Sequence, residues 1–91
     1  MDISQFDLDV NEISGKIMKI ADEMFPNRNW VMKATFWSDT DFRIEIDSSW
    51  GGKKDSFEYQ KSTGQLKLKK ITSVSESLMN VDSEEILEGV I

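Results

Sequence analysis

The side chains that could carry out chemistry in this sequence are carboxylates, lysines and hydroxyls. Its 91 residues include 17 Asp and Glu and 11 Lys and Arg, but no histidine and no cysteine. The usual general base, the thiol nucleophile and the common transition-metal ligands are therefore missing. A catalyst would need paired carboxylates, a lysine or a lysine-activated serine. Because the carboxylates lie mainly where solvated helix and turn surfaces are expected, we expect no enzymatic activity.

Two short segments superficially match ligand-binding motifs. Residues 7–11 begin like a calcium-binding loop, but Glu12 replaces the turn glycine and Met18 stands at the position of the bidentate acid. Residues 51–54 (two glycines and two lysines) lack the spacing and the Ser or Thr of a phosphate-binding loop. A helix cap and a flexible connection explain the two segments. The sequence therefore predicts no catalytic residue, no cofactor and no metal site.

Charge is distributed unevenly along the chain, which has a formal net charge of −6. Residues 1–25 carry six acids and two bases, and residues 72–91 carry five acids and no base. Residues 26–71 carry six acids and nine bases. Acidic ends thus flank a mildly basic middle. Because the whole chain is negative, attraction to nucleic-acid phosphates would be weak, and direct nucleic-acid binding is not expected.

The length of the chain fits one domain, and we interpret residues 1–91 as a single α+β domain. No apolar run approaches the roughly 18 residues that a membrane span needs. The N-terminus also lacks a basic region followed by an apolar run, as a secretory signal would have. We therefore expect a cytoplasmic protein with no membrane partner.

Apolar residues at steps of three and four predict an N-terminal helix over about residues 9–25. Pro26 ends this pattern, because proline disfavours helical geometry in the residue before it. Gly15 lies in the middle and either allows a close approach to the sheet or faces solvent. The apolar stripe consists of Val10, Ile13, Ile17, Ile20, Ala21 and Met24.

Period-two alternation then predicts a four-stranded antiparallel meander over about residues 30–71. Residues 48–54 are interpreted as a loop, and residues 61–64 as a hairpin turn closed by a glycine. Asp82 and Glu85 have capping-box spacing, which predicts a short C-terminal helix within a helical tail over about residues 73–90. The predicted fold is an N-terminal helix packed on the sheet, followed by this short helix. The apolar face of the first strand would comprise Trp30, Met32, Ala34 and Phe36.

The order of these elements resembles the PepSY pattern, in which a helix precedes a small sheet whose last hairpin often reads D-x-x-T-G. The likeness spans roughly residues 13–71 and includes Phe25-Pro26 and the hairpin over residues 59–66. Gln60-Lys61 stand where an aspartate is usual. PepSY domains are typically exported. The resemblance implies a non-catalytic, inhibitory or ligand-binding role.

The sheet face away from the helix is the predicted binding surface. A single amphipathic helix can cover one face, so the second would stay open, and exposed tryptophans and arginines tend to mark interfaces. An alternative has Trp37 packing across the strands on lysine stems and Trp50 folding over the sheet edge. The candidate partner-binding residues are Trp37, Trp50, Lys33, Arg43, Lys67 and Lys69.

These observations predict a non-catalytic protein–protein interaction module, such as a small inhibitor or regulator. Its partner would be another protein or a second copy of the chain, bound through the open face or an edge strand. The alternative is a role related to nucleic acid. The acidic ends would then occupy a basic nucleic-acid-binding protein, or the basic hairpin would bind nucleic acid weakly. A carboxylate-based enzyme ranks third and would need a deep cleft lined by converging acids.

Overall fold

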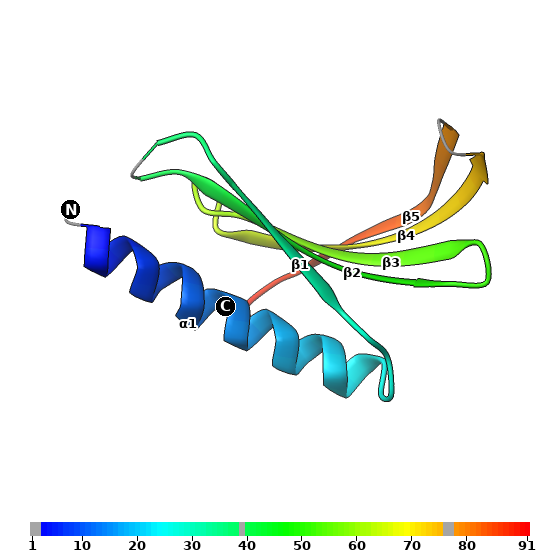
Figure 1. The fold of residues 1–91 in the computed structure, drawn as a ribbon, viewed down its shortest axis with the longest axis horizontal. Helices are drawn as coiled ribbons and strands as arrows, with labels where there is room; N and C mark the ends of the chain where they lie inside the picture. The colour runs from blue at the N-terminus through cyan, green and yellow to red at the C-terminus, as the bar shows by residue number, and fades with distance from the viewer. Residues whose placement is uncertain (1–2, 39, 76–77) are drawn as a thin grey trace.

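The computed structural model describes residues 3–38, 40–75 and 78–91, with side-chain surroundings for residues 9–38, 40–72 and 80–91. Helix α1 (Ile3–Met24) precedes five strands: β1 (Val31–Phe36), β2 (Phe42–Trp50), β3 (Lys53–Gln60), β4 (Gln65–Ser75) and β5 (Leu78–Leu87). Each strand pairs antiparallel with the next along the chain, giving the meander in Figure 1. The α+β class is confirmed. Across the described residues, no helix has the length and apolar character to cross a membrane.

Helix α1 buries most of the stripe that its sequence predicts, but Ile20 is only partly buried and Met24 is exposed. Val10, Ile13, Ile17 and Ala21 are buried, at the steps of three and four that place side chains on one helix face. The helix begins earlier than predicted, at Ile3, and ends where expected. Phe25 N donates the last helical hydrogen bond to Ala21 O at 2.8 Å, and Asn27 then turns the chain with a φ of 65°.

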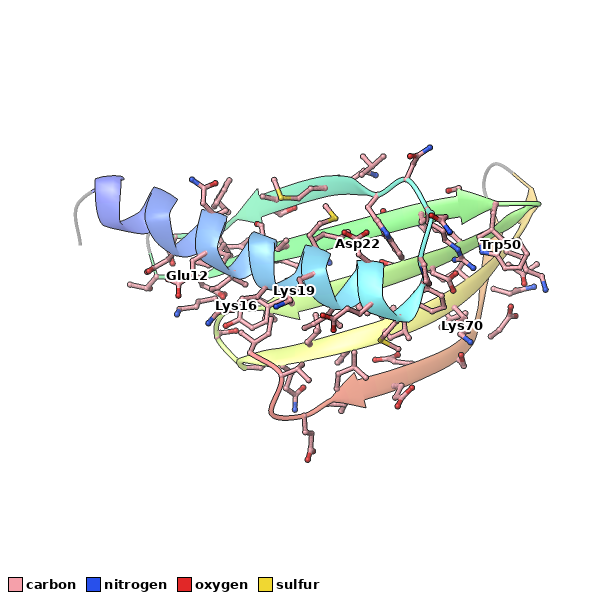
Figure 2. The ribbon with its side chains drawn as sticks, turned by 90° about the horizontal axis from the view of Figure 1, so that it is seen from below. Glu12, Lys16, Lys19, Asp22, Trp50 and Lys70 are labelled. Carbon is pink, nitrogen blue, oxygen red and sulfur yellow. The ribbon has the colours of Figure 1, made fainter. Side chains whose placement is uncertain are left out.

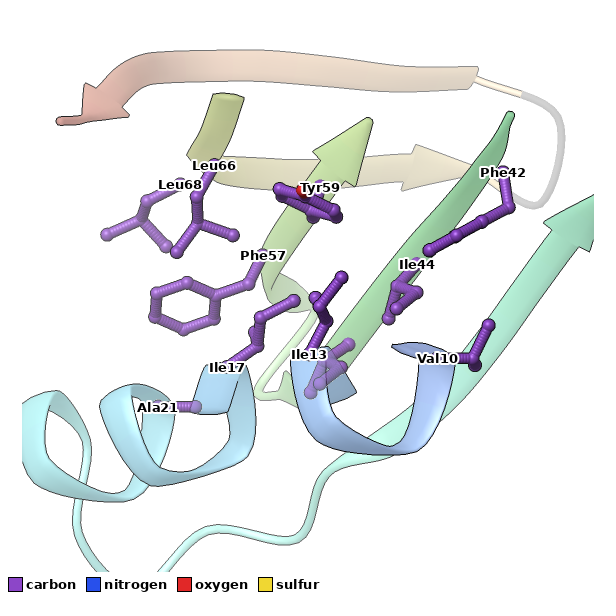
Figure 3. Packing of buried hydrophobic residues seen from close by; sticks show 11 residues of the cluster. Val10, Ile13, Ile17, Ala21, Phe42, Ile44, Phe57, Tyr59, Leu66 and Leu68 are labelled. Carbon is purple, nitrogen blue, oxygen red and sulfur yellow. The ribbon is translucent and has the colours of Figure 1, made fainter. Parts of the chain in front are cut away.

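The core lies between α1 and the central strands, as Figure 3 shows. Each large side chain buried there contributes about 1.5–3 kcal/mol relative to exposure. In Figure 2 the helix runs across the middle of the sheet, with β1 and β5 at the two sides. Both edge strands therefore receive less cover than the centre. The strand residues in the core are Phe42, Ile44, Ile46, Phe57, Tyr59, Leu66 and Leu68.

The predicted apolar face of the first strand is only partly covered. Trp30 packs against the core, but Met32 and Phe36 remain 46% and 53% exposed. Position explains the difference, because α1 lies over the central strands and β1 is at the edge. Gly15 is exposed, with open space where a Cβ would stand, so the solvent-facing alternative holds for this glycine.

The first correction concerns residues 48–54, which do not form a loop. Strands β2 and β3 extend through them and leave a turn at Gly51 and Gly52, with φ of 51° and 76°. Two successive positive φ angles suit a tight hairpin turn and favour glycine. The turn predicted at residues 61–64 is confirmed, since Gly64 has a φ of 67° and donates to Gln60 O at 2.8 Å.

The second correction concerns the tail, where the predicted C-terminal helix and the count of four strands are wrong. Strand β4 continues to Ser75, and β5 returns antiparallel beside it. Pairing with β4 satisfies the backbone groups on one side of residues 78–87, and together with cross-strand contacts this outweighs the local helix signal. Two register shifts, at Lys70/Ile71 and at Ser73/Ser75, break the regular alternation that would have revealed a strand.

Candidate binding surfaces

The structure separates the six candidate residues into two places. Lys33, Arg43, Lys67 and Lys69 alternate with core-facing residues, so they lie on the outer face, the sheet face that points away from α1. Trp37 directly follows β1 and lies on the same face, against Arg43. Trp50 continues the alternation of Ile44 and Ile46 and lies on the α1 side instead. The candidates therefore do not form one surface.

The basic residues of the outer face are largely paired with acids. Glu58 lies 3.0 Å from the Lys69 ammonium and 3.7 Å from the Arg43 guanidinium, and Lys67 lies 3.2 Å from Glu84. A partner on this face would have to desolvate charges that are already matched. The same pairing reduces the positive charge that the basic hairpin could offer to phosphates.

Carboxylates also meet on the outer face, at Glu45 and Asp47. The Lys54 ammonium lies 3.9 Å from Glu45 and 3.8 Å from Asp47. Burial and the neighbouring Asp47 raise the pKa of Glu45, while Lys54 and Arg43 oppose the rise. In the described part of the chain, no group of three or more His, Cys, Asp or Glu could hold a metal ion.

The β1 edge carries several exposed apolar side chains. Trp37 is 55% exposed, and the Arg43 guanidinium carbon lies 5.8 Å from its ring centroid. This contact matches the cross-strand alternative for Trp37, with an arginine in place of the lysine stems. Val31, Met32 and Phe36 are also exposed. Lys33 is the single charged residue of the strand.

The hydrogen-bond pattern shows which β1 residues face the open edge. Trp37 N donates to Asp41 O at 3.2 Å, so position 37 belongs to the set that bonds to β2. Because bonding residues alternate along an antiparallel pair, the other set comprises Met32, Ala34 and Phe36. The amides and carbonyls of these three residues therefore point away from β2. Within the described part of the chain, no strand pairs with the outward groups of Met32 and Ala34, which therefore form an open strand edge.

The β5 edge is built differently. Its pairing with β4 contains two register shifts, whereas the β1–β2 register is continuous. Three exposed acids lie along it, beside the exposed Val81 and Ile86. Bulges and charges are devices that keep an edge from pairing with another chain. The acids are Asp82, Glu84 and Glu85.

Trp50 belongs to a polar cluster that sequence reasoning missed. Its indole Nε1 donates to Asp55 Oδ2 at 3.1 Å, and the Arg28 guanidinium pairs with the same oxygen. The Asp55 side chain is 6% exposed. Alternation places Asp55 on the core face of β3, and an acid there is a signal that a cation must lie nearby. Nothing in the sequence identified Arg28, which follows the α1–β1 turn, as that cation.

Comparisons with protein families, with curated proteins and with solved structures find no match for this chain. Function is therefore inferred from the surfaces of the molecule itself.

Proposed function

We propose that this protein is a non-catalytic protein-binding module that accepts an extended segment of a partner protein along β1. The observation that carries the proposal is the open edge at Met32 and Ala34. No described strand pairs with the outward backbone groups of these two residues, and the edge also has exposed apolar side chains and a continuous register. A partner strand would add to the sheet, with backbone hydrogen bonds giving affinity and alternating side chains giving specificity. The single-domain organisation and the cytoplasmic location stay predictions.

The side chains of β1 define the chemistry of the partner segment. On the α1 side, Met32, Ala34 and Phe36 would lie beside alternate residues of the added strand, which should be apolar. On the outer face, Lys33 has no acid at ion-pair distance among the described residues. An acidic residue of the segment would complement it. The expected partner is thus an extended segment that alternates apolar residues with polar ones, including an acid.

The available contacts suit a moderate affinity. Each new backbone hydrogen bond contributes about 0.5–1.5 kcal/mol net, and the outward amides and carbonyls of Met32 and Ala34 offer several such bonds. Ordering the segment and losing its free motion cost part of this gain. We therefore expect dissociation constants on the order of micromolar, equivalent to about −8 kcal/mol.

A library of phage-displayed random 12-residue peptides tests the proposal and does not require the natural partner to be identified first. Selection on the immobilised protein should yield peptides with alternating apolar residues and an acid. These peptides should lose at least about tenfold in affinity for Ala34→Pro, which removes an outward amide. Ala34→Val is the matched control, because it keeps that amide and has a side chain suited to strands.

Three outcomes would contradict the proposal. The selected peptides could bind Ala34→Pro as tightly as the wild type, or carry apolar residues at helical spacing. The third is that no peptide is selected and the protein instead self-associates through another surface. Self-association that Ala34→Pro abolishes would keep β1 as the docking edge and identify a second copy as its occupant.

A further inference from the structure

A hollow lies on the α1 side of the sheet, where the strands continue past the end of the helix. Its volume is about 290 Å³, near the lower limit of typical small-molecule sites. Residues of the α1–β1 turn, the β2–β3 hairpin, β4 and β5 line it. Figure 2 shows Trp50 and Lys70 at this end of the sheet, beyond the last turn of α1. The hollow arises because Pro26 and Asn27 turn the chain away before the helix reaches the end of the sheet.

One wall of the hollow is held in place by the cluster around Asp55. The Arg28 guanidinium carbon lies 4.7 Å from the Phe25 ring centroid and 5.0 Å from that of Trp50. The same guanidinium pairs with Asp55, which also accepts the Trp50 indole hydrogen bond. The two donors fix the rotamer of the buried Asp55 carboxylate, and stacking on the two rings fixes that of the Arg28 guanidinium. The indole of Trp50, 48% exposed, therefore presents a fixed apolar surface.

Two lysines of the hollow, Lys53 and Lys70, have no acidic partner among the residues that the structure describes. Across the β3–β4 pair, Lys53 lies opposite Thr72 and Lys70 lies opposite Asp55, so the two lysines are diagonal neighbours on the same face. Such neighbours are about 7–8 Å apart, within joint reach of long side chains. Among the described residues, no carboxylate lies at ion-pair distance from either ammonium. The Lys53 ammonium instead lies 5.6 Å from the Trp50 ring centroid.

The other charges around the hollow are already engaged. Arg28 is matched by Asp55, and Lys54 approaches the acids Glu45 and Asp47 of the outer face. Asp82, on the β5 side, accepts a hydrogen bond from the Thr72 hydroxyl, and its carboxylate offsets one of the two lysine charges. The lining of the hollow therefore has a local excess of about one positive charge in a protein whose formal net charge is −6. An anion would find here two donors and a partly apolar wall.

We propose that this hollow binds a small organic anion. Its phosphate or carboxylate group would lie between Lys53 and Lys70, and its carbon part against the Trp50 ring. The volume of about 290 Å³ lies at the lower end of the range for small-molecule sites, which limits the ligand to a small molecule. An anion would also draw the Lys53 ammonium away from the indole and uncover that ring. Phosphates and carboxylates share this chemistry, and probes that carry one or the other distinguish them.

Nuclear magnetic resonance titrations test the proposal with three aromatic probes. Phenyl phosphate supplies a ring and a phosphate, benzoate supplies a ring and a carboxylate, and phenol supplies a ring without charge. The Trp50 Nε1–H signal, assigned with Trp50→Phe, reports on the hollow. One or both anions should shift it in a saturable way that weakens with added salt, and phenol should not. Stronger binding of phenyl phosphate or of benzoate would identify the preferred head group.

Charge-removing variants locate the binding site. Lys53→Gln and Lys70→Gln should each weaken anion binding about five- to tenfold, because each removes one charge-assisted hydrogen bond. Lys61→Gln is the matched control, since it removes the same charge from an exposed turn at the opposite end of β3. All three lysines are exposed, so folding should be unaffected.

Equal weakening by Lys61→Gln, or equal binding of phenol, would overturn the anion site. So would saturable shifts confined to residues outside the hollow. The test is independent of the proposed function, because Ala34→Pro alters the β1 edge and should leave anion binding unchanged. Failure of one proposal therefore leaves the other standing.

Discussion

Strands β1 and β5 close the same sheet at opposite sides, but their edges differ in charge and in regularity. β5 carries three exposed acids and two register shifts, which discourage another strand from pairing with it. β1 carries one lysine and a continuous register, and it exposes Met32 and Phe36. The β1 edge thus has less of this protection than the β5 edge, and this difference supports the proposed docking site.

The largest expected effect distinguishes the two sets of β1 amides. Thr35 belongs to the set that bonds to β2, and Ala34 to the outward set. Thr35→Pro should lower the free energy of unfolding by about 2–3 kcal/mol, because it removes a ladder hydrogen bond and leaves a carbonyl unpaired. Ala34→Pro should cost less than about 1 kcal/mol. Urea unfolding of both variants measures the difference, and equal losses would show that the edge is assigned wrongly.

A charge added to each edge should affect peptide binding unequally. Met32→Lys places a cation among the apolar side chains of β1 and should weaken a selected peptide about tenfold, or about 1.4 kcal/mol. Val81→Lys makes the same kind of change on β5 and should leave binding unchanged. Fluorescence anisotropy with a labelled peptide measures both. A larger loss for Val81→Lys would transfer the docking edge to β5.

Removing two acids from β5 should make its edge pair more readily with another strand, as the β1 edge is expected to do. We expect Glu84→Thr combined with Glu85→Val to give weak, concentration-dependent self-association, because charged residues no longer oppose strand pairing. The two register shifts remain, so the association should stay weaker than peptide binding at β1. Light scattering over a range of protein concentrations measures it. A fully monomeric double variant would show that the bulges alone protect this edge.

The smallest effect concerns Glu45, which lies opposite Lys33 on the strand next to β1. Burial and Asp47 raise its pKa in the folded protein, so the folded state favours the protonated form of Glu45. This preference stabilises the folded state. The stabilisation is fully present below the pKa that Glu45 has in the unfolded chain, and it is lost as pH rises through the pKa that Glu45 has in the folded protein. Glu45→Gln should therefore raise the free energy of unfolding at pH 7, by less than about 1 kcal/mol. The gain should shrink as the solution is acidified, and a gain that grows instead would contradict the assignment.

The sequence predicted the helix and the central strands well, because their patterns are regular. The stripe from Val10 to Ala21 has helical spacing, and β2 alternates between core and outer face. β5 was missed for the opposite reason. Its bulged pairing breaks the alternation, and the spacing from Asp82 to Glu85 imitates a helix start. Pairing with β4 is a long-range interaction that no local pattern reports.

The candidate surfaces were predicted in part. Trp37 and Lys33 lie at the proposed docking edge, and the outer-face lysines were placed on the correct face. Their pairing with Glu58 and Glu84 depends on neighbours across strands, which the sequence alone did not specify. Trp50 was assigned to a loop, and its true face became clear only because β2 and β3 continue to a two-residue turn.

Amide hydrogen exchange of the two edges, with and without a selected peptide, tests the central claim most directly. In the free protein, the outward amides of Met32 and Ala34 should exchange fast, because no described strand covers them. A saturating peptide should slow these two amides strongly and leave the β5 edge unchanged. Protection gained along β5 instead, or bound peptide without added protection on β1, would contradict strand addition at this edge.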